Sequence, residues 1–297
     1  MKRQLSILIP VYNRLCTSLV MQISHQAMHI NGLQYEIIIA DDASTDVAIE
    51  KENKTQAENT PNAHYIRLET NKGRSAIRNY LAQCSQYPWL LFLDCHVTLT
   101  DNVFLKKYVD TPDQYGVICG GVSSLPPENG RHNLRYKYEK ALSKKFSVSK
   151  RADKPYQSFR TTNFLISRDV MLRHPFDETI KKYGYEDVVL GYTLEKSHTP
   201  ILHIDNPVAY REYEPNDVYL RKIEEAVTNL YDLSDKLYLY SPLLRTYKKM
   251  ERLHMTSFIK KMSPFLLRII KRQLTSKHPS VLLFQIYKLI YLTKTAR

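Results

Sequence analysis

Short, almost continuously apolar runs alternate along the first hundred residues with polar-apolar segments of helical length. The apolar runs cover residues 5–11, 35–40, 63–68 and 89–93. Runs this short and apolar at successive positions are typical of strands buried on both faces of a parallel sheet. The intervening segments 15–30 and 74–84 have the length of crossover helices. The repetition therefore predicts an α/β sheet with right-handed crossovers.

The pattern is less regular after residue 100. Four more short strands are expected, at residues 117–122, 161–167, 200–204 and 207–210. Residues 130–156 are basic and polar, and we expect a loop with a helix there. A helix is expected over 186–196, where early acidic residues suit the positive end of the helix dipole, and another over 217–240. Helical periodicity continues to the end, which predicts an α/β domain over 1–215 and a helical region over 216–297.

Polar segments occur where the predicted strands end. Four of them contain charged side chains: residues 10–14, 41–46, 71–78 and 94–96. In open α/β sheets, ligands bind beyond the carboxyl ends of the strands. The sequence therefore predicts a ligand site built from these segments.

Two of these segments suit a nucleotide. Residues 41–46 (DDASTD) offer carboxylates that accept hydrogen bonds from a base or ribose. The alternative is helix N-capping by Ser44 or Asp46. Residues 71–79 bring basic side chains and backbone N–H groups to the start of a helix, which suits a phosphate or ribose. The alternative there is an ordinary solvated helix.

Two other places offer catalytic chemistry. Asp94 and His96 follow the most apolar strand, and in an extended segment they would point to the same side and could bind one divalent cation. Such a cation would neutralise a diphosphate leaving group. The alternative is a turn at the end of the strand. At the start of the helix over 186–196, a carboxylate of Glu186 or Asp187 could act as a general base, or it could merely stabilise the helix end.

The positive charge is concentrated at the end of the chain. The formal net charge is +13, and residues 241–297 contain 13 Lys and Arg against one acid, Glu251. The four cysteines form no C-x-x-C pair and suggest no disulfide framework, which suits a reducing cytoplasm. The apolar run 5–11 is too short to span a bilayer and no cleavage site follows, so we expect neither a transmembrane helix nor a signal peptide there.

Five motifs, in this order, resemble those of family 2 glycosyltransferases, which have the GT-A fold. They are SILIPVYNR at 6–14, DDASTD at 41–46, NKG at 71–73 with Arg78-Asn79, Leu93-Asp94 at the D-x-D position, and Glu186-Asp187 at the E-D position. Each motif is loose alone, but the five in order are specific. The resemblance covers about residues 4–213.

The resemblance implies an inverting enzyme that uses a nucleoside diphosphate sugar, usually a UDP sugar. Pro10 and Tyr12 would line the base pocket, with the Tyr12 ring available for stacking, and Asp42 would hydrogen-bond the base. Arg14 and Arg78 are expected to be donor-binding residues, with Arg78 near the ribose or phosphates.

The resemblance also implies the catalytic groups. Asp94 would approach the ribose or a metal, and His96 the metal. Asp187 would deprotonate the acceptor hydroxyl, and Glu186 beside it would contact the acceptor. A single in-line displacement at the anomeric carbon then needs only one carboxylate base, unlike the paired carboxylates of hydrolases.

Two positions depart from the family pattern. His96 stands where the family has the second acid of D-x-D, and Tyr210 where it has a later metal-binding histidine. Imidazole in place of a carboxylate shifts the preference from Mg²⁺ toward Mn²⁺ or a later metal, and a weakened metal site is equally compatible. We expect activity to depend on a divalent cation, Mn²⁺ or Mg²⁺.

The basic C-terminal region suggests where the protein acts. Basic helices with apolar faces suit an anionic membrane surface, and the alternative is a helical subdomain that packs or dimerises. We expect a cytoplasmic protein, or one peripheral to the inner face of the cell membrane, with a glycan or lipid-linked acceptor for cell-surface polysaccharide synthesis. No nucleic-acid partner is expected, because no recognisable nucleic-acid module accompanies the charge.

Two other functions remain alternatives to transfer. One is a catalytically weakened homologue that binds nucleotide or scaffolds a membrane complex. The other is a nucleotidyltransferase, which would need a glycine-rich phosphate loop near the first strand, whereas residues 10–14 contain no glycine.

Overall fold

The computed structural model describes residues 2–127, 132–143, 146–210 and 212–296. The chain packs as two compact units. The first comprises residues 1–123, 146–181 and 190–210, and the second residues 124–145, 182–189 and 211–297. The predicted domain boundary after residue 215 remains a proposal. The two units above are defined by how the chain packs, and residues 124–145 and 182–189 belong to the second of them.

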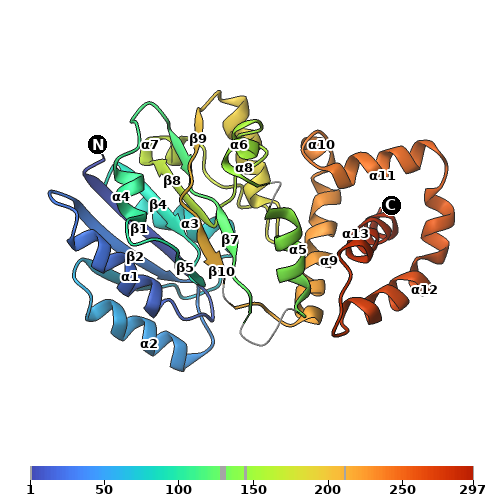
Figure 1. The fold of residues 1–297 in the computed structure, drawn as a ribbon, viewed down its shortest axis with the longest axis horizontal. Coiled ribbons are helices and arrows are strands. Elements are labelled where there is room, and N and C mark those ends of the chain that lie inside the picture. Colours follow the sequence, from blue (N-terminus) through green and yellow to red (C-terminus); the bar gives the residue numbers. More distant parts are fainter. Residues whose placement is uncertain (1, 128–131, 144–145, 211, 297) are drawn as a thin grey trace. The chain divides into compact units, whose positions relative to one another are not determined.

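A seven-stranded sheet forms the centre of the first unit, in the order β3-β2-β1-β4-β8-β6-β9 (Figure 1). Its strands are β1 (Gln4–Val11), β2 (Gln34–Asp41), β3 (Ala63–Arg67), β4 (Trp89–Leu93), β6 (Val117–Cys119), β8 (Asn163–Ser167) and β9 (Ile201–His203). The first four strands are parallel, as expected. The sheet as a whole is mixed, because β8 runs antiparallel to both β4 and β6. The predicted α/β class is confirmed.

Helices cover both faces of this sheet. From β1 to β3 the chain steps twice in one direction, through α1 (Thr17–Met28) and α2 (Val47–Glu58), and then returns past β1 to β4 through α3 (Arg74–Cys84). Right-handed crossovers therefore put α1 and α2 on one face and α3 on the other. α4 (Phe104–Val109) packs with α1, and α7 (Arg168–Arg173) with α3. The reversal between β1 and β4 is the switch point where α/β sheets bind ligands.

The apolar runs are buried as their pattern predicts. Ile7, Leu8 and Ile9 of β1 are fully buried, so both faces of this strand contact core side chains. Phe92 of β4 stacks on Phe164 of β8, with ring centroids 4.9 Å apart. Buried apolar faces of this kind fix the strand register, because a one-residue slip would turn every side chain to the opposite face.

A small second sheet, in the order β5-β10-β7, was only partly predicted. It contains β5 (Val97–Leu99), β10 (Val208–Tyr210) and β7 (Val122–Ser124). The strand expected over 117–122 ends at Cys119, because Gly120 and Gly121 break it. A Cβ on Gly120 would lie 2.4 Å from the backbone oxygen of Asn206, so only glycine fits this close approach.

The second unit is helical. It contains α5 (Leu134–Ser143), α9 (Asn216–Asp232), α10 (Ser234–Leu237), α11 (Pro242–Arg252), α12 (Thr256–Leu274) and α13 (Val281–Thr295). Its core joins α5, α9, α12 and α13 through Leu134, Leu220, Leu274 and Phe284, all fully buried. The single helix expected over 217–240 is two, because Leu233, at φ −98° and ψ 13°, leaves helical geometry.

Two further expectations concern the loop over 130–156 and the presence of membrane-spanning helices. The loop expected over 130–156 contains α5 and α6 (Val148–Ala152), while residues 130, 131, 144 and 145 lie outside the described residues. Among the helices of the described residues, none has the length and apolar character required to cross a bilayer.

Candidate active site

The loops after β1 and β2 are tied together at the carboxyl edge of the sheet. Asn13, at φ 49°, accepts hydrogen bonds at Oδ1 from the backbone N of Thr45 (2.8 Å) and Asp46 (3.1 Å). Its own N–H donates to Ser44 Oγ at 2.8 Å. The neighbouring Tyr12 side chain is left 47% exposed. An exposed aromatic ring at this edge is available to stack on a base.

Pro10 lies near the end of β1, opposite Ala40 of β2. Its missing N–H costs no ladder bond to β4, because the pairing of β1 with β4 ends at Leu8 and Phe92. Asp46 caps α2 by accepting from the backbone N of Ala48 and Ile49. The N-capping interpretation is therefore confirmed for Asp46.

Asp42 is buried and braces the start of α3. Its Oδ1 accepts from the backbone N of Lys72 at 2.7 Å, and its Oδ2 from that of Gly73 at 2.9 Å. Burial raises the pKa of the Asp42 carboxyl, and these two bonds offset only part of that rise. The expectation that backbone N–H groups of this loop would bind phosphate is wrong for these two residues, because their N–H groups serve Asp42.

Asp94 and Arg78 form a buried ion pair. Arg78 Nη2 donates to Asp94 Oδ1 at 2.8 Å, and the guanidinium lies over the ring of Phe176. Burial alone would raise the pKa of the Asp94 carboxyl, but the charges of Arg78, Arg74 and His96 outweigh it and hold that pKa below its usual value. Arg78 is buried itself, so it acts on Asp94 in this structure rather than presenting its charge to solvent.

Positive side chains gather around the turn after β4. Burial raises the pKa of the Cys95 thiol to about 12, although the charges of Arg14 and Arg74 oppose that rise. Both arginine side chains are exposed. Together with the buried Arg78, they place three guanidinium groups around a single carboxylate. The local charge therefore favours a polyanion such as a diphosphate.

We expected Asp94 and His96 to lie in one extended segment, but the structure does not place them in one. Residues 95 and 96 form a turn before β5. The His96 ring stacks on Tyr210, with ring centroids 5.1 Å apart and planes 15° apart. Tyr210 lies there because it pairs with Val97 across the small sheet, and its hydroxyl lies 2.9 Å from Thr162 Oγ1. The two departures from the family pattern, His96 and Tyr210, are thus neighbours.

The turn after β4 offers few side-chain atoms that could bind a divalent cation. Arg78 engages one oxygen of Asp94, and the half-buried His96 imidazole lies close enough for its charge to lower the Asp94 pKa. Within the described parts of the chain, no three His, Cys, Asp or Glu side chains come together as a metal cluster. A carboxylate and an imidazole fit Mn²⁺ chemistry as a partial ligand set, which phosphate oxygens of a bound donor could complete.

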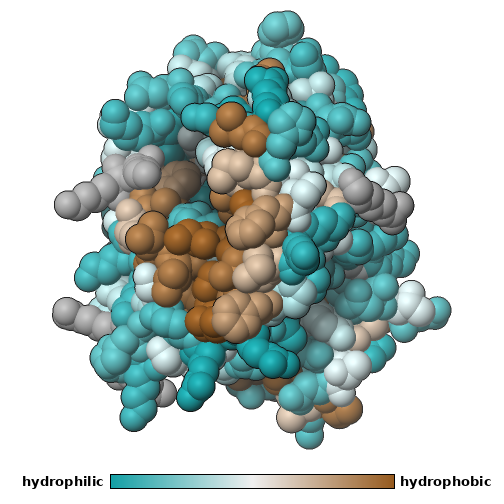
Figure 2. All heavy atoms as spheres, turned by 90° about the vertical axis from the view of Figure 1, so that its right-hand side faces the viewer, coloured by the Kyte–Doolittle hydropathy of each residue, from teal (hydrophilic) through white to brown (hydrophobic). Residues whose placement is uncertain are grey.

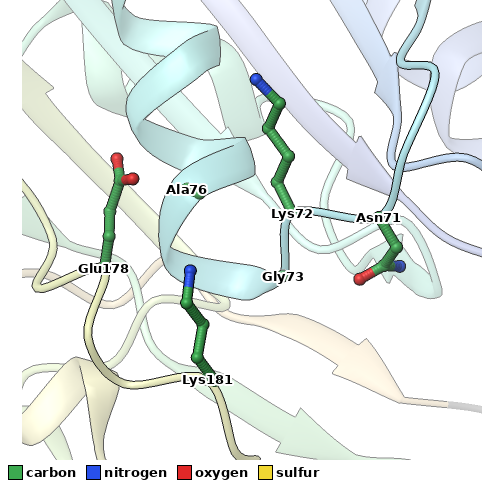
Figure 3. A pocket seen from close by; sticks show the side chains of 6 residues that line it. All are labelled: Asn71, Lys72, Gly73, Ala76, Glu178 and Lys181. Carbon is green, nitrogen blue, oxygen red and sulfur yellow. The ribbon is translucent and has the colours of Figure 1, made fainter.

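A pocket of about 470 Å³ opens beside the start of α3 (Figure 3). It is lined by Asn71, Lys72, Gly73, Ala76, Glu178 and Lys181. Glu178 accepts a hydrogen bond from Asn79 Nδ2 at 2.8 Å. In Figure 3 the Lys181 side chain points toward the first turn of α3. The two lysines give the pocket a positive rim suited to an anionic group.

The Glu186-Asp187 pair lies in the second unit, at the start of α8 (Glu186–Lys196). Gly184 and Tyr185 precede it with φ values of 90° and 72°. Asn229 of α9 donates to the backbone oxygen of Gly184 at 2.5 Å. Glu186 is buried and Asp187 is half-buried. A left-handed turn clamped by α9 therefore presents both carboxylates at the positive end of a helix.

Sequence reasoning missed three groups of this site. Arg74 belonged to a recognised motif but was not singled out, although its charge acts on both Asp94 and Cys95. Glu178 and Lys181 come from a segment without a motif, and only folding brings them to α3. No local signal in the sequence marks them.

Comparisons with known proteins identify the family and the fold of the chain. Residues 6–174, more than half of the chain, match the model of the family described as glycosyl transferase family 2. The match includes the loops after β1, β2 and β4 and ends before Glu186 and Asp187.

The curated relatives include a chondroitin synthase and a hyaluronan synthase. A chondroitin synthase of Escherichia coli is 25% identical over 245 residues, which cover 71% of this chain and 35% of that protein. A hyaluronan synthase of Pasteurella multocida is 24% identical over 244 residues, covering 71% of this chain and 25% of that protein. The chain therefore spans about a quarter to a third of the length of these relatives.

Solved structures share the fold. The mannosyltransferase PcManGT from Pyrobaculum calidifontis, in complex with GDP-Man and Mn²⁺, matches with a TM-score of 0.58 at 11% identity, covering 99% of this chain and 87% of that one. Residues 1–349 of S. aureus TarS, in complex with UDP-GlcNAc, match with a TM-score of 0.53 at 16% identity, covering 97% and 90%. The expected GT-A fold is confirmed.

Proposed function

Because the chain belongs to glycosyl transferase family 2, we propose that it transfers a sugar, with inversion, from a nucleoside diphosphate sugar to a hydroxyl group. The proposed donor is a UDP sugar, and the proposed acceptor is a glycan or a lipid-linked glycan in cell-surface polysaccharide synthesis. The chondroitin and hyaluronan synthases among its relatives support this class of product.

The observation that carries the proposal is the charge around the turn after β4. Arg78 is paired with Asp94, and the exposed Arg14 and Arg74 bring further positive charge to the same turn. A diphosphate bound there would be stabilised most at the moment the sugar departs, when charge develops on the leaving phosphate. Fixed cationic groups can thus contribute to catalysis as well as to binding.

The base and ribose are assigned to the loops that precede this turn. Tyr12 is proposed to stack on the base, with Pro10 beside it. Asp42 is proposed to hydrogen-bond the base; each of its oxygens accepts one backbone bond and has a further lone pair. The exposed Tyr12 ring supports this assignment.

A divalent cation, Mn²⁺ or Mg²⁺, is proposed as the cofactor. Asp94 and His96 are the residues that would hold it. When bound, it would supply Lewis acidity and neutralise charge on the diphosphate. The structure of PcManGT with GDP-Man and Mn²⁺, which shares the fold, supports a cation of this class. We expect turnover with a matched donor to be lost in excess chelator and restored best by Mn²⁺.

Asp187 is proposed as the base that removes the proton from the acceptor hydroxyl, with Glu186 contacting the acceptor. The hydroxyl oxygen would then attack the anomeric carbon as the bond to the diphosphate breaks. Support comes from the half-buried position of Asp187 at the start of α8, a place fixed by the left-handed turn before it. The buried Glu186 beside it is better placed to position than to exchange protons with solvent.

The test is a screen of UDP and GDP sugars with the full chain and either cation, following nucleotide release and transfer. Release should disappear in Asp94→Ala. Asp187→Asn should keep nucleotide affinity and lose transfer by a factor on the order of 10²–10⁴, the usual contribution of a general base. Asp110→Asn, at an exposed ion pair outside the site, is the matched control.

The outcomes separate the possible functions. Nucleotide binding without release under every condition would favour a catalytically weakened homologue. An Asp187→Asn variant as active as the parent would remove Asp187 from its proposed role while leaving the donor site intact. We propose that the enzyme acts in the cytoplasm or at the inner face of the cell membrane, with the C-terminal region facing an anionic surface.

A further inference from the structure

Two C-terminal helices of the second unit, α12 and α13, and the segment before α12 leave large apolar side chains in solvent. Helix α12 carries Phe258, Phe265 and Ile269, which are 71%, 60% and 52% exposed. Leu282 and Ile286 of α13 are exposed as well, as are Leu253 and Met255 between α11 and α12. Figure 2 shows apolar side chains gathered at the centre of the face that includes α11 and α12, with hydrophilic side chains around them.

Helix α12 is apolar on two opposite sides. Its inner side places Leu267, Ile270 and Leu274 in the core of the second unit. Its outer side repeats apolar residues at 258, 262, 265 and 269, the spacing of a second helical stripe. A surface helix needs only one apolar stripe to pack on its core. The outer stripe therefore requires another explanation.

Basic residues follow this outer stripe at a fixed offset. Lys261, Arg268 and Arg272 each come three residues after Phe258, Phe265 and Ile269, respectively, and all three are exposed. Residues three apart are neighbours on a helix surface. Each exposed apolar side chain of α12 thus has a cation beside it, within a segment, 241–297, whose only acid is Glu251.

We propose that this outer face of α12, with the exposed residues of α13 and of 253–255, docks on an anionic lipid surface. Phenylalanine, leucine and isoleucine side chains would enter the boundary between headgroups and acyl chains while the flanking cations contact lipid phosphates. A second copy of this chain is a poorer occupant, because it would bring two strongly basic faces together. The binding is peripheral, in keeping with α12 and α13 each being too polar or too short to cross a bilayer.

This inference specifies the membrane association proposed above and does not depend on the transfer reaction. It is tested with the full chain and vesicles of phosphatidylcholine, alone or with about 30% phosphatidylglycerol, in a flotation assay. The parent should bind only the anionic vesicles, and less strongly as salt rises. Phe258→Ser with Phe265→Ser, and separately Lys261→Glu with Arg268→Glu, should each weaken binding by about tenfold or more.

Matched controls lie on α2 of the first unit. Val47 is 75% exposed, and Lys51 and Lys54 are exposed cations. Val47→Ser and Lys51→Glu with Lys54→Glu should leave vesicle binding unchanged. Nucleotide release in solution should be unchanged in the α12 variants, so a failure of lipid binding is distinguishable from a failure of the proposed reaction.

Three results would overturn the inference. They are equal binding of parent and α12 variants, equal binding to neutral and anionic vesicles, and no binding to either. Light scattering on the same samples provides a further check. A dimer that dissociates in the Phe258→Ser, Phe265→Ser variant and binds no vesicles would assign the face to a second copy instead.

Discussion

At the scale of single residues, the Asp94–Arg78 pair dominates the centre of the site. Both side chains are almost completely buried, so water cannot solvate the charge that remains when its partner is removed. Breaking a buried ion pair by removing one partner costs about 3–5 kcal/mol, far more than the loss of an exposed pair. The pair therefore stabilises the first unit and also sets the local charge that the proposed sugar donor would meet.

Arg78→Met should accordingly lower the free energy of unfolding by about 3–5 kcal/mol in urea titrations. Arg173→Met, which breaks the exposed pair with Asp169, is the matched control and should cost at most about 1 kcal/mol. Similar losses of unfolding free energy in the two variants would contradict the view that the unpaired Asp94 charge destabilises the fold because it is buried.

A second residue-scale prediction concerns His203, whose Nδ1 accepts from the buried Arg151 at 3.0 Å while its Nε2 lies 2.9 Å from the Pro155 oxygen. Burial, together with the Arg151 charge, lowers the pKa of His203 to about 4. Between that value and the ordinary pKa of 6.5, the unfolded chain binds more protons than the folded one. Stability should therefore fall as the pH drops through this window, by on the order of 3 kcal/mol.

The measurement is the free energy of unfolding at several pH values across this window. His203→Gln preserves a donor and an acceptor without titrating, and it should flatten the dependence. His64→Gln, at an exposed histidine, should leave the slope as in the parent. An unchanged slope in His203→Gln would show that other groups cause the pH dependence.

At the same scale, part of the candidate site was predictable. Asp42 and Asp94 were found because a carboxylate directly after a buried apolar run has a recognisable context. Their partners were not, because the Lys72 and Gly73 amides and the Arg78 guanidinium meet them only across the sheet edge. The turn at 95–96 was mistaken for extended chain, since two residues provide no period to interpret.

At the scale of elements, the start of α8 depends on the turn at Gly184. Its φ of 90° is strained for any other residue, and a Cβ there would lie 2.9 Å from the Ala226 Cβ of α9. Gly184→Ala should displace the beginning of α8, which carries Asp187. Because the turn would be strained and α9 pushed away, we expect a loss of about 1–3 kcal/mol in stability together with a fall in transfer activity.

Gly32→Ala is the matched control for this turn. Gly32 also has a positive φ, 71°, but a Cβ there would meet no atom within 4 Å. It should cost only the backbone strain, about 1 kcal/mol, and leave transfer unchanged. If both variants lost activity equally, the position of α8 would not depend on the contact with α9.

Helices with several turns of periodic sequence were predicted well, and strands of three residues poorly. The helices over 74–84 and 186–196 were found with the bounds that the structure gives them. The three-residue strands β5 and β7 were missed, because pairing with β10 alone makes them strands. The helix over 217–240 was predicted as one piece because apolar periodicity continues through Leu233, where the backbone breaks it.

At the scale of the whole molecule, charge is separated along the chain. The net charge of +13 is almost wholly accounted for by residues 241–297. Like charges confined to a few helices repel each other, and dissolved salt screens them. The C-terminal helices therefore carry a stability penalty that a membrane or a polyanion could relieve.

Raising NaCl from about 20 mM to about 500 mM should therefore raise the thermal midpoint of unfolding by a few degrees. Lys260→Glu with Lys261→Glu should shrink this response, because it removes charge from the basic segment. Lys51→Glu with Lys54→Glu, on α2 of the first unit, should leave the response near that of the parent. A midpoint insensitive to salt in all three proteins would contradict charge repulsion as a source of instability.

The sequence by itself determined the α/β class, the positions of the main strands along the chain, the family and the concentration of charge at the end of the chain. All of these depend on local periodicity, on short motifs or on composition, which can be recognised along the chain itself. Only the tertiary structure decided that Arg78 is buried against Asp94, that His96 stacks on Tyr210, and that only one of the two apolar sides of α12 is covered. Those facts depend on which side chains meet across sheets and helices, and no spacing along the chain records such meetings.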